Sequence, residues 1–408
     1  MVQPMPSVRV GFKNDAETQP HEGEKTLTAQ PPQTSRRVDR IHSLTAMRGL
    51  AALSVFGFHV STTGVFANND DVSDTIDVLM KPAGTVGVSF FFILSGFVLA
   101  WSSRAEDKYN TFVYRRIARV YPSHLVTFLI AMTIFAFETT QVFTAVLNLL
   151  LAQAWVPDPN IFLGVNGVTW SLSCELFFYL MFPFLIKILD SLTMRALMVT
   201  IVSILVLIFL LPVVAMILPE QPTFIAEVHG EPLAGQSIVQ MWFVYIFPIS
   251  RICEFILGIS LGCVAKSTCK FAQWLPLFVT LLPISYVIGM FAPWTFTAVS
   301  VTVIPLAGIV VSLASKEIQE TLQRLPRWIQ SRPLRYFGDI SYAFYLMHGI
   351  VISWMHSNLG KLNTSITGSV IFLLGALCLS FISAAALHHG IERPAFHLLT
   401  RKLPCKYK

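Results

Sequence analysis

Ten apolar runs, each about long enough to cross a lipid bilayer as a helix, dominate this 408-residue sequence. The hydrocarbon core of a membrane is about 30 Å thick, and a helix needs about 20 residues to cross it. Hydrophobic residues make up 54% of the chain and charged residues only 13%, about half the charge density of a soluble domain. The pattern predicts an all-α, polytopic transmembrane bundle of about ten helices, near residues 43–64, 85–101, 124–146, 169–189, 195–218, 239–264, 273–291, 295–315, 336–357 and 367–388.

Three regions depart from simple spans. The second run is short and rich in glycine, and the seventh and eighth runs are separated only by a turn near Pro293. The apolar stretch Val142–Trp155 is too short to span the membrane and return. We expect it to be re-entrant or interfacial.

Charge asymmetry predicts the orientation of the ten spans. With the N-terminus inside, almost all Lys and Arg residues fall on cytoplasmic segments, and only Lys81 and Lys361 fall outside. The outer loops instead carry acidic residues: Asp70, Asp71, Asp74, Asp77, Glu220, Glu227 and Glu231. This is the distribution that the positive-inside rule predicts, with both termini in the cytoplasm of a multi-pass protein of the plasma or inner membrane.

The ends of the chain are polar. Residues 1–40 are rich in Pro, Gln, Glu and Thr and have no apolar signal-peptide region, so we expect a disordered cytoplasmic tail. Residues 396–408 are expected to form a basic cytoplasmic tail, which leaves 41–395 as the transmembrane domain. The six cysteines contain no CxxC pair, so no disulfide framework or metal site is indicated. The net charge is +6, but the basic residues lie between the apolar runs and do not form a stripe on a soluble domain. Nucleic acid is therefore not an expected partner.

Six ionisable residues fall within the predicted spans, where a charge is costly and usually functional. They are Arg48, His59, Glu175, Arg251, Glu254 and His348. Arg48 and His59 are eleven positions apart, so they share one helix face, with His59 about 16 Å further along the axis. A snorkelling arginine and a hydrogen-bonded core histidine would explain this pair equally well.

Glu175 and His348 are expected at a depth similar to that of His59, on two other helices. Two imidazoles and a carboxyl group suit proton transfer, because imidazole titrates near neutral pH. The alternative is a structural polar network that joins the helices. Arg251 and Glu254 are three positions apart on one helix face and are expected to neutralise each other.

Arg116 and Arg119 lie in a basic segment that precedes the third predicted span, at positions i and i+3 of a helix start. Guanidinium groups bind phosphate in a forked geometry, so these residues could bind a phosphorylated donor. A basic loop that only fixes membrane orientation would carry the same residues.

Several ordered motifs resemble the acyltransferase-3 family of integral-membrane acyltransferases. Arg48 and His59 are followed by the block Gly87–Phe97 and by Arg116 and Arg119 with Tyr121 and Pro122. Further blocks contain Trp170, Ser171, Glu175 and Tyr179, then Arg251, Glu254 and Gly258, then Tyr342, Tyr345 and His348, and finally Glu392, Arg393 and Pro394. Together the motifs cover about residues 41–395.

The resemblance implies an O-acyltransferase that moves an acyl group, by default acetyl, from cytoplasmic acyl-CoA to a hydroxyl on the far side of the membrane. The implied acceptor is a carbohydrate or glycolipid of the cell envelope. It also implies that His59 is the essential base, with Glu175 and His348 in the catalytic core and Arg48, Arg116 and Arg119 near the donor. Trp170, Ser171, Tyr179, Arg251, Glu254 and Tyr345 are expected to support the site. The rival interpretation is a proton-coupled transporter or exporter that uses the buried His and Glu residues as a relay.

Overall fold

A computed structural model describes residues 41–66, 70–103, 108–225, 234–319, 326–359, 365–401 and 403. All described residues belong to one compact unit, which lies within Asp39–Lys408. The expected tail at residues 1–40 lies outside the described residues, and the expected tail at 396–408 is described only for 396–401 and 403.

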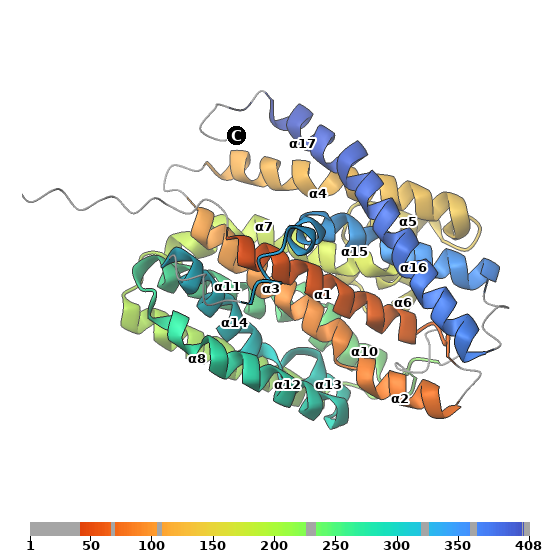
Figure 1. Ribbon diagram of the computed structural model, residues 1–408, viewed down its shortest axis with the longest axis horizontal. Helices are drawn as coiled ribbons and strands as arrows, with labels where there is room; N and C mark the ends of the chain where they lie inside the picture. Colours follow the sequence, from red (N-terminus) through yellow and green to blue (C-terminus); the bar gives the residue numbers. More distant parts are fainter. Residues whose placement is uncertain are drawn as a thin grey trace, which may run out of the picture. The chain divides into compact units, whose positions relative to one another are not determined.

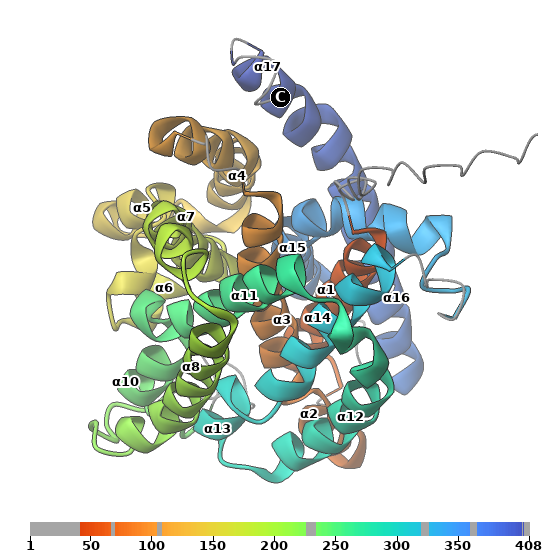
Figure 2. The ribbon, with the colours of Figure 1, turned by 90° about the vertical axis from the view of Figure 1, so that its left-hand side faces the viewer.

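The described part of the chain is helical, which confirms the predicted all-α bundle (Figures 1 and 2). Apart from an isolated bridge between Thr223 and Ser237, no β-structure forms within it. Its α-helices are α1 (His42–Ser61), α2 (Asp70–Met80), α3 (Ala83–Ser102), α4 (Tyr109–Ala131), α5 (Val142–Leu149), α6 (Pro159–Phe162), α7 (Trp170–Leu189), α8 (Met194–Ala215), α10 (Ile238–Met241), α11 (Pro248–Ser267), α12 (Leu275–Phe291), α13 (Trp294–Val299), α14 (Val303–Ile318), α15 (Arg332–Leu359), α16 (Ile366–Leu387) and α17 (Arg393–Thr400). Short π or 3-10 turns are η1 (Met132–Ala136), η2 (Gln153–Trp155), η3 (Gly167–Thr169), η5 (Trp242–Ile246), η6 (Lys270–Trp274) and η9 (His388–Glu392).

Every predicted span corresponds to a long helical segment. Nine segments among the described residues are long and apolar enough to cross a membrane. The span predicted near 336–357 forms the 28-residue helix α15, which is not among these nine. Polar positions such as Tyr342, Tyr345 and His348 lower its hydropathy, although these three side chains face other helices or the cavity described below. The stretch Val142–Trp155 does not span: α5 has eight residues and is therefore about 12 Å long.

The third span begins earlier than the sequence predicted. The expected bounds were 124–146, but α4 begins at Tyr109 and η1 ends at Ala136. Arg116 and Arg119 therefore lie within the second and third turns of the helix, and not in a basic segment before it. Hydropathy penalises arginine as if it faced lipid, whereas both side chains line an internal cavity.

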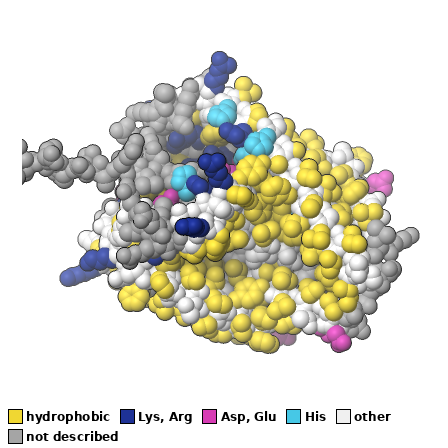
Figure 3. Space-filling model, in the orientation of Figure 1, with side chains coloured by type: hydrophobic (Ala, Val, Ile, Leu, Met, Phe, Trp, Pro, Cys, Tyr) yellow, Lys and Arg dark blue, Asp and Glu magenta, His cyan; other side chains and the backbone are white. Residues whose placement is uncertain are grey.

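Helices differ strongly in how much of their surface other helices cover. In the most apolar window of the segment Trp294–Ile318, 83% of residues are buried, but only 11% are buried in Lys270–Phe291 and 28% in Ile366–Thr400. Ile371 and Ile382 on α16 are both 65% exposed, although they are large and apolar. Such surfaces are suited to lipid, and the apolar side chains that cover much of one face are visible in Figure 3.

Glycines allow the central helices to approach each other closely. A Cβ atom at Gly258 of α11 would collide with the carbonyl oxygen of Ile93 on α3, and one at Gly96 would collide with that of Phe255. A Cβ atom at Gly338 of α15 would collide with the carbonyl oxygen of Thr45 on α1. Small residues permit such backbone contacts, which drive helix association in membranes. These contacts join α3 closely to α11 and α1 closely to α15.

The start of α1 is capped by a residue that is distant in the sequence. Ile41 offers no side-chain cap, but the Glu317 carboxylate at the end of α14 accepts hydrogen bonds from the backbone N–H groups of His42 and Ser43 at 2.7 and 2.9 Å. The Ser43 hydroxyl donates a third bond at 2.7 Å. A carboxylate at this position satisfies free N–H groups and opposes the positive end of the helix dipole. Glu317 therefore fixes α1, the helix that carries Arg48 and His59.

Candidate active site

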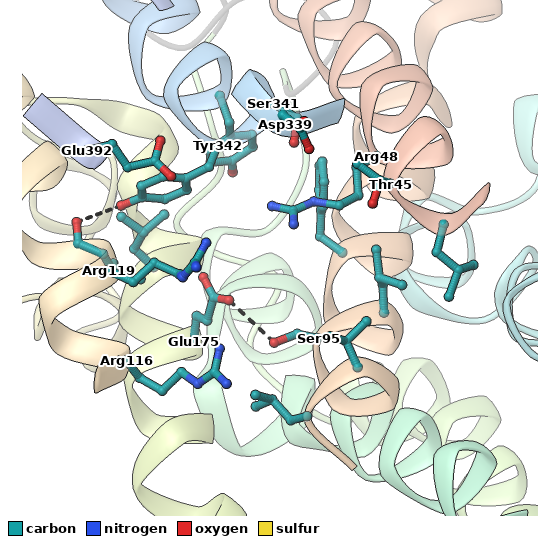
Figure 4. A pocket seen from close by; sticks show the side chains of 18 of the residues that line it. Thr45, Arg48, Ser95, Arg116, Arg119, Glu175, Asp339, Ser341, Tyr342 and Glu392 are labelled. Atoms are coloured by element: carbon teal, nitrogen blue, oxygen red, sulfur yellow. Dashed lines mark hydrogen bonds between the residues drawn. The ribbon is translucent and has the colours of Figure 1, made fainter. Parts of the chain in front are cut away.

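A cavity of about 650 Å³ lies between α1, α3, α4, α7, α15 and the C-terminal segment (Figure 4). It follows α1 from Ile41 to Arg48 and α15 from Asp339 to Tyr345. Its polar lining collects most of the site residues that the sequence predicted: Arg48, Arg116, Arg119, Ser171, Glu175, Tyr179 and Tyr345.

Three arginines project into this cavity from two helices. Arg48 extends from α1, and Arg116 and Arg119 extend from successive turns of α4 (Figure 4). The buried Nε atoms of Arg48 and Arg116 have no hydrogen-bond partner among the described residues. An unsatisfied buried donor is costly, and a cluster of positive groups with free donors favours an anion. The cavity thus has the chemistry of a phosphate- or carboxylate-binding site.

Glu175 lies among these arginines in Figure 4. Its Oε1 atom accepts hydrogen bonds from the Tyr179 hydroxyl and from the Ser95 hydroxyl, the latter at 3.4 Å. Within the described residues it forms no ion pair with Arg48 or Arg116, so the donors of these two arginines stay available. The structure places Glu175 in the cavity, and not in contact with His59 as the expected proton-transfer centre would require.

His59 and His348 contact each other outside the cavity, about one to three turns further along α1 and α15 than the last residues of these helices that line it. The Nε2 atom of His348 is 3.2 Å from the Nδ1 atom of His59, and the ring centroids are 5.0 Å apart. The two histidines lie further along α1 and α15 than the lining residues Arg48 and Tyr345, and neither lines the cavity. His348 is fully buried, whereas His59 is partly exposed.

Carbonyl groups define a consistent protonation pattern for this pair. The carbonyl of Val55 is 2.9 Å from Nδ1 of His59, and that of Phe344 is 3.2 Å from Nδ1 of His348. Because carbonyls only accept, two neutral rings with hydrogen on both Nδ1 atoms satisfy these contacts. The His59 Nδ1–H is then shared between the Val55 carbonyl and Nε2 of His348, and Nε2 of His59 keeps its lone pair. This is the arrangement of a general base held by a second group.

A polar contact joins Tyr345 and Ser171 in the lining of the cavity. The Tyr345 and Ser171 hydroxyl oxygens are 2.8 Å apart, and each lies 3.1 Å from the carbonyl oxygen of Val168, so one hydroxyl donates to the other and the second donates to Val168. The Asn166 amide donates to the carbonyl of Leu346 at 3.0 Å, which ties the same loop to α15. The ring centroid of Tyr345 is 5.6 Å from that of His348. Tyr345 therefore links the lining of the cavity to His348.

The remaining residues that were predicted to support the site contact other protein side chains and do not line the cavity. Arg251 Nη2 is 2.9 Å from Glu254 Oε2, so the ion pair expected from their spacing forms. Arg251 also donates to Ser89 at 3.3 Å and lies over the rings of Phe92 and Tyr245. The Trp170 ring centroid is 4.7 Å from that of Tyr245. These residues pack α3, α7 and α11 together behind the cavity.

Sequence reasoning missed the C-terminal wall of the cavity. His388, Glu392, Arg393, Phe396 and His397 line it, although the predicted transmembrane domain ended at 395 and the closing Glu392-Arg393-Pro394 motif had no assigned role. The available signal was that Pro394 is compatible with a helix that begins next to it, because proline is tolerated in a first helical turn. Glu317 was missed because its partner lies 274 positions away.

The acyltransferase domain family matches residues 41–387. The chain is a member of the acyltransferase-3 family. This membership covers every helix that lines the cavity except the C-terminal segment after residue 387. Among the described residues of this acyltransferase, no group of three His, Cys, Asp or Glu residues could hold a metal ion.

Two curated relatives resemble this acyltransferase over most of its length. The acyltransferase MdmB of Streptomyces mycarofaciens is 34% identical over 382 residues, which cover 90% of this chain and 95% of the relative. A putative peptidoglycan O-acetyltransferase of Bacillus subtilis (strain 168), YrhL, is 22% identical over 87% of this chain and 54% of its own length. No solved structure matches the chain significantly.

Proposed function

We propose that this acyltransferase transfers an acyl group, by default acetyl, from cytoplasmic acyl-CoA to a hydroxyl of a cell-envelope carbohydrate or glycolipid outside the plasma or inner membrane. The observation that carries the proposal is the arrangement of two linked centres on α1. The arginine-lined cavity surrounds Arg48, and the histidine pair contains His59, eleven positions further along the same helix. The rise between them is about 16 Å, so a long donor could bind its charged end at one centre and react at the other.

In the proposed orientation, the end of the bundle where α1 and α15 begin faces the cytoplasm, as the positive-inside rule favours. Phosphates of the donor bind Arg48, Arg116 and Arg119, and Glu175 and Tyr179 keep these cations spaced. The thioester arm extends past Tyr345 and Ser171, whose hydroxyls must part to admit it. The acceptor approaches His59 from the opposite side of the membrane.

The proposed reaction is a direct displacement. His59 Nε2 takes the proton of the acceptor hydroxyl, whose oxygen attacks the thioester carbonyl carbon. The new C–O bond forms, the C–S bond breaks, and the proton passes from His59 to the departing thiolate. His348 holds the His59 ring through Nε2 and so acts as a positioning residue.

A putative peptidoglycan O-acetyltransferase among the relatives supports an envelope carbohydrate as acceptor. Membership of an acyltransferase family disfavours the alternative of a proton-coupled transporter, which would break no covalent bond. A measurement of thioester consumption by the purified protein separates the acyltransferase from the transporter.

The decisive experiment incubates purified protein with radiolabelled acetyl-CoA and an extract of envelope glycans and glycolipids. We expect label to enter the extract with release of free CoA thiol, and we expect His59→Ala to lose this transfer by at least about 100-fold. Donor binding by His59→Ala should remain, which shows that the variant is folded. Full transfer by His59→Ala would overturn the role of this histidine, and no thioester consumption by the wild type would overturn the proposed reaction.

A further inference from the structure

The C-terminal helix contributes one whole wall of the cavity, although the family match ends at residue 387. The segment Ile366–Thr400 runs without interruption through α16, the π turn η9 and α17. Its cavity-lining positions are spaced by four, one, three and one residues, which places them on one helix face. These residues are His388, Glu392, Arg393, Phe396 and His397.

Contacts with α4 hold this wall in place. The Tyr114 hydroxyl donates to the carbonyl of Leu399 at 3.0 Å. The Arg119 guanidinium lies over the ring of Phe396, 4.8 Å from its centroid. The helix after residue 387 is thus docked beside the arginine motif and is not a free tail.

The arginines at this wall are not neutralised by acidic side chains among the described residues, so they are available to bind an anion. The only acidic side chain among its lining residues, Glu392, is already bound to Nδ1 of His388 at 2.8 Å. Within the described residues, neither Arg119 nor Arg393 forms an ion pair with an acidic side chain. Basic and histidine side chains gather at this end of the molecule in Figure 3, over α17, α4 and the start of α1.

The cavity therefore holds cations at two levels. Arg48 and Arg116 lie deep, with buried Nε atoms that lack a partner, and Arg119 and Arg393 lie at the exposed mouth with the aromatic ring of Phe396. A ligand that matches both levels has two separated phosphate groups, with an aromatic base near the outer one. Coenzyme A has this form, with a diphosphate in the middle and a 3′-phosphoadenosine at its end.

We infer that the wall formed by η9 and α17 is a binding subsite for the 3′-phosphoadenosine end of the donor, with Arg393 as the residue that contacts the 3′-phosphate. The diphosphate then binds the deep arginines Arg48 and Arg116. This inference rests on the proposed acyl-CoA donor and adds a residue outside the matched family domain. It makes the last turns of the chain part of the donor site.

The test compares the affinities of CoA and 3′-dephospho-CoA, which differ by one phosphate, for the full-length purified protein. We expect the wild type to prefer CoA, and Arg393→Gln to weaken CoA binding by about tenfold or more while leaving 3′-dephospho-CoA binding unchanged. Unchanged binding of the second probe also shows that the variant is folded. Arg393→Lys, which keeps the charge but not the fork, should recover part of the preference.

Arg401→Gln is the matched control, because Arg401 is exposed, adjoins α17 and does not line the cavity. It should leave the affinities for both probes unchanged. The inference is overturned if Arg393→Gln weakens both probes equally, weakens neither, or matches Arg401→Gln. If the wild type binds neither probe, the proposed donor itself is wrong, whereas equal wild-type affinity for the two probes overturns only the 3′-phosphate subsite.

Discussion

The Nε2 atom of His348 lies 3.2 Å from the Nδ1 atom of His59, although 289 positions separate them in the sequence. The contact exists because α1 and α15 run side by side, with Gly338 against the backbone of Thr45 near their starts. Both rings also have a carbonyl partner at Nδ1, so the free nitrogen of the pair is Nε2 of His59. In the proposed mechanism, His59 is therefore the reacting histidine and His348 the supporting one.

His348 should be replaceable by a side chain that keeps an acceptor near the Nε2 position. We expect His348→Ala to lower the rate of acyl transfer about tenfold or more, because the His59 ring loses its orienting partner. His348→Gln should recover part of that loss, since its amide oxygen can accept from His59 Nδ1–H. The measurement is kcat for acyl transfer, with donor affinity as the control for folding. Equal loss in the two variants would mean that His348 serves only to fill space.

Arg116 should contribute to donor binding more than to the chemical step. Its Nε atom is buried without a partner, so Arg116→Gln removes a charge-assisted interaction with the ligand and should weaken CoA binding about tenfold or more. Lys187→Gln makes the same change of charge at an exposed position in the last turn of α7 and should leave affinity unchanged. Equilibrium binding of CoA to both variants decides the matter, and equal affinities would leave Arg116 with a purely topological role.

Glu317 should stabilise the fold through the start of α1. Glu317→Ala removes the acceptor of three hydrogen bonds and should lower the free energy of unfolding by about 1–2 kcal/mol. Ser43→Ala removes one of the three and should have a smaller effect. Thermal unfolding of the purified protein in one detergent compares the two. A melting temperature of Glu317→Ala equal to that of the wild type would contradict the capping role.

Gly258 should not tolerate even one added methyl group. Its Cβ atom would collide with the carbonyl oxygen of Ile93, so Gly258→Ala must separate α3 from α11 and should cost about 1–3 kcal/mol. Gly390 is the matched control, because a Cβ atom there meets nothing within 4 Å. Thermal unfolding should show a lower melting temperature for Gly258→Ala than for Gly390→Ala. Indistinguishable melting temperatures would show that the helices can shift without loss.

Most of the spans were predictable because a run of about 20 apolar residues is a local feature of the sequence, whichever neighbours later cover it. The start of α4 was not predictable from hydropathy, because Arg116 and Arg119 face a cavity that only the assembled helices create. The pairing of Arg251 with Glu254 followed from a spacing of three residues along one helix. The separation of Glu175 from His59 did not follow, since depth along a helix does not say which neighbour a side chain faces.

The contact between Tyr345 and Ser171 has an electrical consequence. A cavity of about 650 Å³ that joined both sides of a membrane would let ions flow down the voltage, and each charge would dissipate about 2.3 kcal/mol per 100 mV. The two hydroxyls are satisfied by each other and by Val168, so they do not invite a chain of water toward the histidines. In the proposed orientation, this contact would keep the charged chamber from joining the two sides of the membrane.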